Sequence, residues 1–460
     1  MLWIDWLALA VVAGAFGVLA WTYAGYLLWL QWRCRRLDRL SGTDAPGQSP
    51  GKDGKDGKDG KDGKDGKDAG TPAGTAPSRL SAPELPFPST DPPAATTVTA
   101  ILAAHNAEAL IGDRLANLLL ESDLNPGSDL PGGITLRVVL VTDGCYDDTA
   151  GAAETWAMAN GRLRSVTILE QPERRGKAAC LNDAVAASSG DMLLFCDVRQ
   201  RFDRAAIRSL VRALQQQPRL GAVSGNLDVA PAASADGQAN AGAAPDGGIG
   251  GGVDLYWKME RRIRHCEARL DSAIGCTGAI YLLRRPLYRP IPADTILDDV
   301  LIPMQITADG WRVGFEPAAR AWDPQPLLPG HEARRKRRTL AGNFQLWFRH
   351  PAWCLPWRHR LWFRWWSHKV LRLWTPVLMQ LVLLVTALAL VLQGRPDWFW
   401  QGLGCAQLAF YGLAVPSILG LRWPWRWLRL PGAFLFLQIQ VVAGAAAWWR
   451  GRSQHGTGAW

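Results

Sequence analysis

The sequence lacks the cysteine patterns that mark a zinc site or a disulfide framework. Its 460 residues include eight cysteines, which are scattered along the chain and form no CxxC pair. Zinc sites and small disulfide-stabilised domains both use cysteines at short, recurring spacings. The absence of such spacings argues against both classes and fits reduced thiols in a cytoplasmic domain.

The pattern of a cleavable signal peptide is also missing from the N-terminus. Residues 6–30 are uncharged, and this run exceeds the roughly 20 apolar residues that cross a bilayer. A signal peptide has positive charge before its apolar core and a small-residue cleavage site after it. Here Asp5 precedes the run and the arginine-rich segment 31–36 follows it. We therefore predict a retained membrane anchor over residues 1–36.

Three further apolar segments near the C-terminus are candidate spans, at 373–393, 399–420 and 430–449, within a predicted membrane region 373–450 and before a tail at 451–460. The middle one contains two glutamines and several glycines and is the least apolar. Arginine and lysine concentrate after the first span of the chain, before the second, and between the third and fourth. By the positive-inside rule, this distribution places residues 31–372 in the cytoplasm and both termini outside.

Acidic residues are fewer than basic ones, 41 against 51, which gives a formal net charge of +10. A basic chain can bind nucleic acid. Here the excess lies beside the predicted spans, as in the tract RRKRR at 334–338. That placement favours a role facing membrane lipids or phosphate groups, and we expect no nucleic-acid partner.

Two low-complexity segments divide the chain. Residues 51–68 are six GKD triplets, and glycine at every third position is typical of collagen, but the run is short and contains no proline. A charge-balanced, flexible tether within a linker at 37–96 is therefore expected. The second segment, 230–252, is rich in alanine and glycine and predicts an exposed loop inside the folded region.

From residue 97 onward, short apolar runs alternate with amphipathic stretches. Strands are expected at 97–104, 136–143, 165–171 and 191–197, with helices near 109–120, 148–160 and 176–188. This alternation predicts an α/β domain with a mostly parallel sheet and helices on both faces. In such a sheet, ligands bind beyond the carboxyl ends of the strands.

Polar residues follow the first two predicted strands. His105, Asn106 and Glu108 lie on the loop after the first strand, where they can reach a nucleoside. The alternative is that Asn106 caps the next helix and His105 is a surface residue. The second strand ends in Asp143-Gly144, where glycine permits a tight turn, while Asp147 or Asp148 can cap the following helix.

The third and fourth predicted strands lead to charged groups suited to a diphosphate. Arg175-Gly176-Lys177 joins a flexible turn to two cations at an expected helix start, which favours anions through its free N–H groups. Solvated surface charge is the alternative. Asp197 follows the apolar run LLFC, and a carboxylate at a strand end is a suitable ligand for Mg²⁺ or Mn²⁺ bridging a diphosphate.

Taken in order, these segments resemble the membrane-bound family-2 glycosyltransferases, the inverting group that includes hyaluronan, cellulose and poly-N-acetylglucosamine synthases. AAHNAEALIG resembles the family's first P-x-YNEE-like loop, DGCYDDT its DGSxDGT, RRGKAACLN its RxGKxxALN, and Asp197-Val198-Arg199 stands at its DxD. Further on, GCTGAIYLLRR at 275–285 resembles the acceptor-side GxxGA segment, and Leu297-Asp298-Asp299 stands where the family has a TED-type base. The resemblance covers roughly residues 97–345 and extends into the C-terminal spans.

The resemblance implies a GT-A-type, Rossmann-like catalytic domain at 97–343 that binds a nucleoside diphosphate sugar, most often UDP-linked. It implies that Asp143 and the loop at 103–108 hold the base and ribose, that Lys177 lies by the nucleotide, and that Asp197 faces Mg²⁺ or Mn²⁺ and the diphosphate. The residues so implied for the nucleotide sugar are Ala104, His105, Asn106, Glu108, Asp143, Gly144, Lys177, Asp197 and Arg199, with Asp197 as the metal ligand.

For the acceptor side, the resemblance implies that Asp299 takes the proton from the acceptor hydroxyl as that hydroxyl attacks the anomeric carbon. Asp298 is the like-charged neighbour that would raise the pKa of such a base. A solvated turn is the alternative for the pair, and the apolar residues on both sides disfavour it. Gly278, Arg335 and Arg338 are expected on the acceptor or diphosphate side.

The chain departs from the family pattern at two motifs. Arg199 replaces the second DxD aspartate and cannot bind a cation, although it can donate to phosphate. We therefore expect weakened metal dependence, or anchoring of the ion by Asp197 alone, since Asp203 is expected to cap a helix. At the family's QxxRW only Arg338, followed by Thr339, matches, so transfer of one or a few sugars is expected as readily as polymer extension.

Residues 344–372 mix tryptophan, phenylalanine and arginine. This composition predicts helices in the membrane interface, and a buried aromatic core is the alternative.

The predicted function is transfer of a hexose or N-acetylhexosamine to a lipid or saccharide acceptor, in polysaccharide synthesis at a bacterial-type inner membrane, with the catalytic domain cytoplasmic. The alternative is a catalytically degenerate transferase-fold membrane protein that acts as a binding or scaffold component. A soluble nucleotidyltransferase is opposed by the predicted spans.

Overall fold

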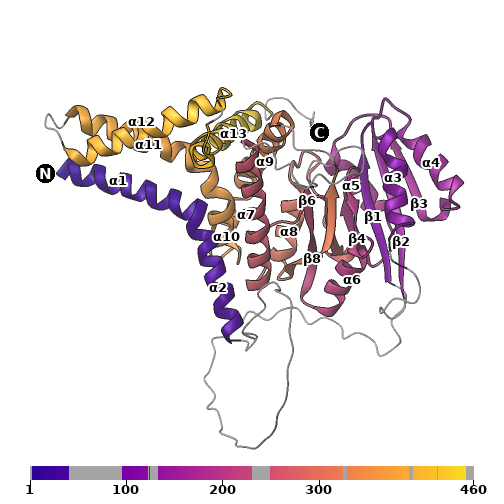
Figure 1. The fold of residues 1–460 in the computed structure, drawn as a ribbon. Helices are drawn as coiled ribbons and strands as arrows, with labels where there is room; N and C mark the ends of the chain where they lie inside the picture. The colour runs from indigo at the N-terminus through magenta and orange to yellow at the C-terminus, as the bar shows by residue number, and fades with distance from the viewer. Residues whose placement is uncertain are drawn as a thin grey trace, which may run out of the picture.

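The computed structural model describes residues 3–40, 96–122, 124, 133–229, 249–324, 329–392, 397–421 and 423–451. Within them, an eight-stranded sheet with covering helices stands beside a group of long apolar helices (Figure 1). The GKD repeats, most of the predicted linker and residues 230–248 of the predicted loop lie outside the described residues. Residues 249–252 are helical rather than looped, because α7 begins at Ile249 and its later turns pack against the domain.

The strands are β1 (Thr96–Ala104), β2 (Ile134–Asp143), β3 (Val166–Gln171), β4 (Met192–Cys196), β5 (Arg201–Phe202), β6 (Leu220–Val229), β7 (Ile280–Arg284) and β8 (Arg312–Asp323). They are ordered β3-β2-β1-β4-β7-β6-β8-β5. The four strands predicted from the sequence are parallel to one another. β7 runs antiparallel to both β4 and β6, so the complete sheet is mixed. The loops after β1, β2 and β4 therefore meet at one edge.

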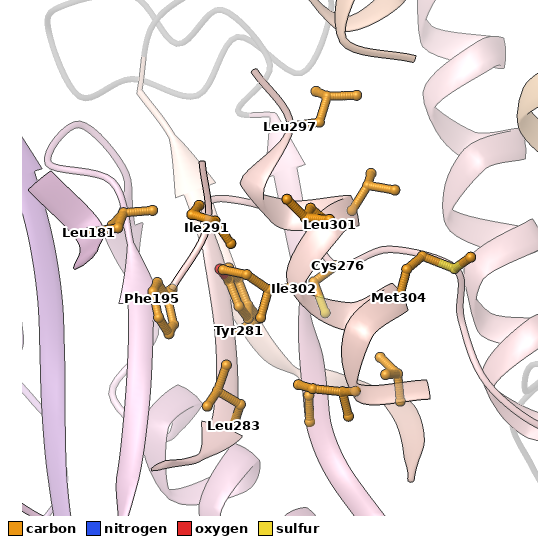
Figure 2. Packing of buried hydrophobic residues seen from close by; sticks show 14 of the residues in the cluster. Leu181, Phe195, Cys276, Tyr281, Leu283, Ile291, Leu297, Leu301, Ile302 and Met304 are labelled. Carbon is orange, nitrogen blue, oxygen red and sulfur yellow. The ribbon is translucent and has the colours of Figure 1, made fainter. Parts of the chain in front are cut away.

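Helices cover both faces of the sheet, as predicted. They are α3 (Glu108–Leu119), α4 (Thr149–Ala159), α5 (Lys177–Ala187), α6 (Ala206–Gln216) and α8 (Asp298–Ala308). Alternate residues of β1 enter different apolar clusters: Ile101 packs in the cluster with α5 and α8, and Leu102 in the one with α3 and α6. In the first cluster, Phe195 of β4 stacks on Tyr281 of β7 with ring centroids 4.8 Å apart (Figure 2).

In the described part of the chain, three helical stretches are long and apolar enough to cross a membrane: Asp5–Leu40, Trp362–Leu392 and Trp427–Gly451. They are formed by most of α1 (Trp3–Ala20) with α2 (Tyr26–Leu40), by α11 (Leu371–Leu392) and by α13 (Leu430–Gly451). They match the spans predicted at 6–30, 373–393 and 430–449, of which residue 393 lies outside the described residues. The remaining predicted span, 399–420, is helix α12 (Trp398–Ile418), which packs against α11 and α13 but is not among the three. Its glutamines, Gln401 and Gln407, lower its mean hydropathy. These helices indicate a membrane protein.

A buried polar cluster joins the sheet domain to the apolar helices, from α2, α7 (Ile249–Leu270) and the π-helical turn Trp366–Val370. His368 lies between two carboxylates, with one ring nitrogen 3.0 Å from Glu260 and the other 3.0 Å from Glu267. Glu260 also pairs with Arg372, and the Tyr26 hydroxyl donates to Glu267 at 2.7 Å. Each ring nitrogen of His368 thus faces a buried carboxylate, and these polar contacts offset part of the cost of burying the charges of Glu260 and Glu267.

The aromatic segment at 344–372 is divided between core and surface. It contains the end of α9 (Pro329–Arg349), a 3-10 turn (Pro351–Cys354) and α10 (Trp362–Trp365). Trp353 and Trp365 are buried in the cluster of β4 and β7, whereas Phe348 and Trp357 are 54% and 74% exposed. The buried-core alternative therefore holds for the inner residues, and the interfacial prediction remains only for the outer ones.

Candidate active site

The loops after β1 and β2 are tied together by hydrogen bonds. The Nδ1 atom of His105 lies 2.7 Å from the Asp143 carbonyl oxygen, and the Asn106 side chain accepts a hydrogen bond from the Tyr146 amide at 2.8 Å. The Glu108 carboxylate accepts one from the amide of the residue before α4, at 3.1 Å. Asn106 has a φ of 50°, a left-handed conformation that asparagine tolerates better than most residues. Three of the predicted nucleoside residues thus hold the two loops in one arrangement.

Asp143 is fully buried at the end of β2 and positions the next loop of the site. Its carboxylate accepts hydrogen bonds from the backbone amides of Arg175, at 2.6 Å, and Gly176, at 2.9 Å. Gly144 has a φ of 56°, and a Cβ there would lie 2.6 Å from the Arg174 amide nitrogen. Only glycine fits this close approach. The structure therefore gives Asp143 a role in holding the loop, and direct contact with the nucleoside stays a prediction.

Lys177, the first residue of α5, places its ammonium between two carboxylates. Its Nζ lies 2.9 Å from Asp197, which follows β4, and 3.5 Å from Asp298, at the start of α8. Burial opposes the charge of Lys177, but the attraction of the two aspartates outweighs burial and raises its pKa. Burial likewise opposes ionisation of Asp197, yet Lys177 lowers the pKa of that carboxyl. Both groups are therefore charged at neutral pH.

The pKa of Asp299, the predicted base, is shifted in the opposite direction to that of Asp197. It is half-buried, and burial followed by the charge of Asp298 raises its pKa to about 6. Its backbone carbonyl accepts a hydrogen bond from the Cys276 amide at 2.8 Å, which fixes the 275–279 segment beside it. A Cβ at Gly278 would lie 3.5 Å from the Asp299 Oδ2 atom, so the missing side chain leaves room at this carboxylate. A carboxylate with such a pKa is suited to accept a proton near neutral pH.

The residue at the second DxD position, Arg199, forms an ion pair. The Arg199 guanidinium lies 2.7 Å from the Asp323 carboxylate, whose side chain is 5% exposed at the end of β8. The Gln200 side chain lies 3.4 Å from the same oxygen. Among the described residues no group of three or more histidine, cysteine, aspartate or glutamate side chains could hold a metal ion. Asp197 is thus the single predicted metal ligand at this position, and its carboxylate is already bound by an ammonium.

Helix α9 brings Arg335 and Arg338 to the site. Gly342 packs closely against the residues just before α8, and the Gln345 side chain accepts from the Ile296 amide at 3.0 Å. The charges of both arginines help to lower the pKa of the carboxyl group that follows β4. Lys177, Asp197 and Asp298 are therefore in contact, and their roles toward a nucleotide sugar stay predictions. Ala104 is buried at the end of β1, and its side chain faces the core.

Two features of the site were missed from the sequence. Tyr146 is 90% exposed, and its ring lies edge-on to His105 with centroids 6.0 Å apart. Its signal was an aromatic residue in a strand-end loop, outside any apolar pattern, and such a ring can stack on a base. Asp323, the partner of Arg199, had no local signal, because the pair is 124 residues apart in sequence.

The predicted helix caps have different outcomes. Asp148 is the N-cap of α4, and its carboxylate accepts from the Gly151 amide at 3.1 Å, as the alternative interpretation held. Asn106 does not cap α3, whose N-cap residue is Ala107. The prediction that Asp203 caps α6 is wrong, because pairing of β5 with β8 brings the Trp322 ring N–H onto its carboxylate.

Residues 99–285 match the family described as Glycosyl transferase family 2. The poly-beta-1,6-N-acetyl-D-glucosamine synthase of Staphylococcus aureus (strain COL) is 22% identical over 256 residues, which are 55% of this chain and 56% of that protein. The synthase of Staphylococcus epidermidis is 18% identical over 255 residues, again 55% of this chain and 56% of that protein. The chain therefore spans little more than half the length of the curated relatives it matches.

Among solved structures, a mannosyltransferase from Pyrobaculum calidifontis, in complex with GDP-Man and Mn²⁺, superposes with a TM-score of 0.59 and 19% identity. The superposition covers 98% of this chain and 99% of that one. At this identity the likeness is one of fold, and it includes the apolar terminal helices as well as the sheet domain. The GT-A-like α/β fold predicted from the sequence is confirmed.

Proposed function

Because this chain carries a family-2 glycosyltransferase domain over residues 99–285, we propose that it transfers a sugar from a nucleoside diphosphate sugar to a saccharide or lipid acceptor, with inversion at the anomeric carbon. The observation that carries the proposal is Asp299. It stands at the start of α8, with its pKa raised to about 6 by burial and by Asp298, and with room at its carboxylate left by Gly278. Those are the properties of a general base.

The proposed reaction uses the site as follows. The acceptor hydroxyl attacks the anomeric carbon, the bond from that carbon to the diphosphate oxygen breaks, and the nucleoside diphosphate leaves with the electron pair. Asp299 takes the hydroxyl proton. Lys177 faces the negative charge that develops on the leaving diphosphate, and a fixed cation in a partly dry site stabilises such charge more than water does. The loops after β1 and β2, with Asp143 behind them, hold the nucleoside.

The relatives guide the choice of donor and acceptor. The staphylococcal proteins are named as synthases of an N-acetylglucosamine polymer, which supports UDP-linked N-acetylhexosamines as the first donors to test. The superposed archaeal structure holds GDP-Man, which puts GDP-sugars second. Thr339 stands where the family has an acceptor-side tryptophan, so short transfers are proposed as readily as long ones. The apolar helices support a membrane location, and the arginine distribution supports a cytoplasmic position for the catalytic domain.

The family and the archaeal structure both suggest Mg²⁺ or Mn²⁺ beside the diphosphate. The donor set of this chain does not fit that group well. Asp197 is its one carboxylate at the DxD position and is bound by Lys177, while Arg199 is paired with Asp323. No step of the proposed reaction is therefore assigned to a metal ion.

The proposal is tested with the full-length protein purified in detergent. Release of nucleoside diphosphate is measured with a panel of UDP- and GDP-sugars, with and without Mn²⁺ or Mg²⁺, for the natural protein and for Asp299→Asn. Loss of a general base lowers turnover by about 10²- to 10⁴-fold. The matched control is Asp309→Asn at the other end of the same helix, where the carboxylate pairs with Arg289 on the surface, and its turnover should not change.

The outcomes separate the proposed function from its alternative. Release from one donor that disappears in Asp299→Asn and persists in Asp309→Asn supports the transferase and identifies its donor. Release that is equal in both variants contradicts the role of Asp299. If no donor is consumed although nucleotide still binds, the chain acts instead as a binding or scaffold component built on a transferase fold.

A further inference from the structure

We propose that fixed cations of the protein, with Lys177 at their centre, bind the donor diphosphate in place of a divalent metal ion, so that nucleotide binding does not require a metal. The inference rests on the proposed function, because it concerns the same diphosphate. It is argued from the position of Lys177, from the ion pair of Arg199 and from the arginines of α9.

The first observation is the place of the Lys177 ammonium. It lies 2.9 Å from the carboxylate of Asp197, which is the predicted metal ligand. A metal ion on the same oxygen would meet a cation at short range, and like charges repel strongly where water is scarce. The Lys177 side chain is 14% exposed, so it has little solvent in which to move away. One oxygen of the predicted metal ligand is thus already paired with a positive charge.

The contact with Asp298 keeps this ammonium in place when a ligand arrives. The Lys177 Nζ lies 3.5 Å from the Asp298 carboxylate, whose side chain is 7% exposed. A diphosphate that displaces Asp197 from Lys177 leaves the second contact intact. The Lys177 ammonium therefore stays between the loop after β4 and the proposed base, Asp299. A diphosphate bound at the strand ends would lie in the same place. An ammonium can accept such an anion as a point charge without a coordination geometry.

The second observation is that the remaining DxD position cannot become a metal ligand. Arg199 stands there, and its guanidinium is held 2.7 Å from Asp323, a carboxylate with a 5% exposed side chain. Releasing Arg199 would leave Asp323 buried without this partner, which is costly. The arginine is therefore fixed beside Asp197, and it adds positive charge where the family has a second negative one. A guanidinium at such a place suits phosphate oxygens.

The third observation is the arrangement of α9. Arg335 and Arg338 lie on this helix, and their charges act on Asp197. The helix cannot shift freely, because the Gln345 side chain bonds the backbone on both sides of Thr295, accepting from the Ile296 amide at 3.0 Å and donating to the Asp294 carbonyl at 2.8 Å. Lys177 thus contacts the single predicted metal ligand, the charges of Arg335 and Arg338 act on it, and Arg199 adds a further cation two positions along the chain. These cations can neutralise a diphosphate without an added ion.

The test is the affinity for nucleotide, measured by isothermal titration of the full-length protein with UDP and with GDP, in EDTA and in excess Mn²⁺. The proposal expects the tighter nucleotide to bind in EDTA with an affinity within about threefold of that in Mn²⁺. Binding that is lost in EDTA and restored by Mn²⁺ would overturn it, while leaving the proposed transferase intact. Failure of both nucleotides to bind under either condition would count against the proposed function itself and hence against this inference too.

A pair of variants ties the result to Lys177. Lys177→Met keeps most of the side-chain length without the charge and should weaken binding in EDTA by about tenfold or more, the effect expected for loss of a charge-assisted contact. Lys177→Arg keeps the charge and should retain most of the affinity, which shows that the site still folds. Arg201→Gln is the matched control, because Arg201 forms an exposed ion pair with Glu121, just after α3, and is not one of the cations proposed to bind the diphosphate. Equal affinity of Lys177→Met and the natural protein in EDTA would contradict the proposal.

A direct metal measurement completes the design. Bound Mn²⁺ is counted by electron paramagnetic resonance in the presence of UDP. The natural protein should hold no stoichiometric Mn²⁺. The double variant Arg199→Asp with Asp323→Asn should gain a Mn²⁺ site. Its first change restores a second carboxylate, and its second removes the buried charge that paired with Arg199. One tightly held Mn²⁺ per natural chain would overturn the proposal.

Discussion

The charge of Lys177 acts on both Asp197 and Asp299, yet the pKa values of these two residues are shifted in opposite directions. Against the effect of burial, Asp197 is held below its usual range by the ammonium 2.9 Å away. Asp299 is raised to about 6, because burial and the neighbouring Asp298 outweigh the same lysine. We call the loops after β1 and β2 with Lys177 and Asp197 the proposed nucleotide half of the site, and Asp299 with Gly278 the proposed acceptor half. The comparison teaches that environment, and not residue type, keeps one aspartate charged and suits the other to accept a proton.

The two halves also differ in how their backbone is held. In the nucleotide half, Asp143 accepts hydrogen bonds from two backbone amides and Asp148 caps a helix, so these carboxylates are used to fix loops. In the acceptor half, Gly278 keeps space at the Asp299 carboxylate. The first half is therefore sensitive to changes that move its backbone, and the second to changes that fill its space.

The largest effect is expected when that space is filled. Gly278→Val places branched carbon atoms against Asp299, since a Cβ alone would already lie 3.5 Å from its Oδ2 atom. Displacing a general base from its reacting geometry costs about 10²-fold or more in turnover. Turnover and nucleotide affinity are measured together, and only turnover should fall. Gly278→Ala, whose single methyl group makes an ordinary contact, should have a smaller effect, and an equal loss in both variants would argue against a steric cause.

Gly144→Ala should weaken the nucleotide half instead. The residue has a φ of 56°, and an added Cβ would lie 2.6 Å from the Arg174 amide nitrogen. We expect destabilisation of about 1–3 kcal/mol, seen as a lower melting temperature in detergent, together with weaker nucleotide binding. Gly402→Ala, in α12, is the control, because a Cβ there meets nothing within 4 Å. Unchanged stability and binding in Gly144→Ala would contradict the close packing of the two loops.

Asp298→Asn should shift the pH dependence of turnover. The charge of Asp298 raises the pKa of Asp299, so its removal lowers that pKa and moves the acid limb of the pH profile to lower pH. The shift should be about half a unit to one unit and is read from kcat/KM between pH 5 and 8. Asp309→Asn, at the other end of the helix, should leave the limb in place. A limb that moves to higher pH would contradict the assigned cause.

The smallest effect is expected for Tyr146→Ala. The ring is 90% exposed and lies beside His105 at the nucleotide end of the sheet. If it stacks on the base of the donor, its loss should raise the KM for the donor by about fivefold or more with little change in kcat, since base stacking contributes about 1–3 kcal/mol. Tyr146→Phe, which keeps the ring, should restore the natural KM. An unchanged KM in both variants would remove Tyr146 from the nucleotide site.

Much of the nucleotide half could be predicted from the sequence, because its signals are local. Each strand from β1 to β4 is a short apolar run that ends in a polar loop, and the motif around Lys177 lies within one turn and one helix start. The direction of β7 was not predictable in the same way, since the chain between β4 and β7 contains two further strands, two helices and a low-complexity segment, so no simple strand-helix-strand repeat links them. The complete sheet is mixed for that reason.

Contacts between residues far apart in the sequence could not be predicted from local sequence patterns. Arg199 was recognised as a departure from the DxD, but Asp323, 124 residues further on, was not recognised as its partner. Asp203 was assigned to a helix cap, because nothing local indicated that Trp322 would lie against it. His368 between Glu260 and Glu267 is a third case, in which a buried charge cluster forms only when distant helices pack. In each case the partner is set by tertiary packing.

The most direct test of the comparison is one pH series read in two ways. Turnover of the natural protein is measured from pH 5 to pH 8, and donor affinity is measured over the same range on Asp299→Asn, so that donor is not consumed. Turnover should fall about tenfold per unit below pH 6, as Asp299 becomes protonated, while donor affinity stays constant because Asp197 and Lys177 keep their charges. Affinity that falls together with turnover, or turnover without an acid limb, would contradict the separate tuning of the two halves.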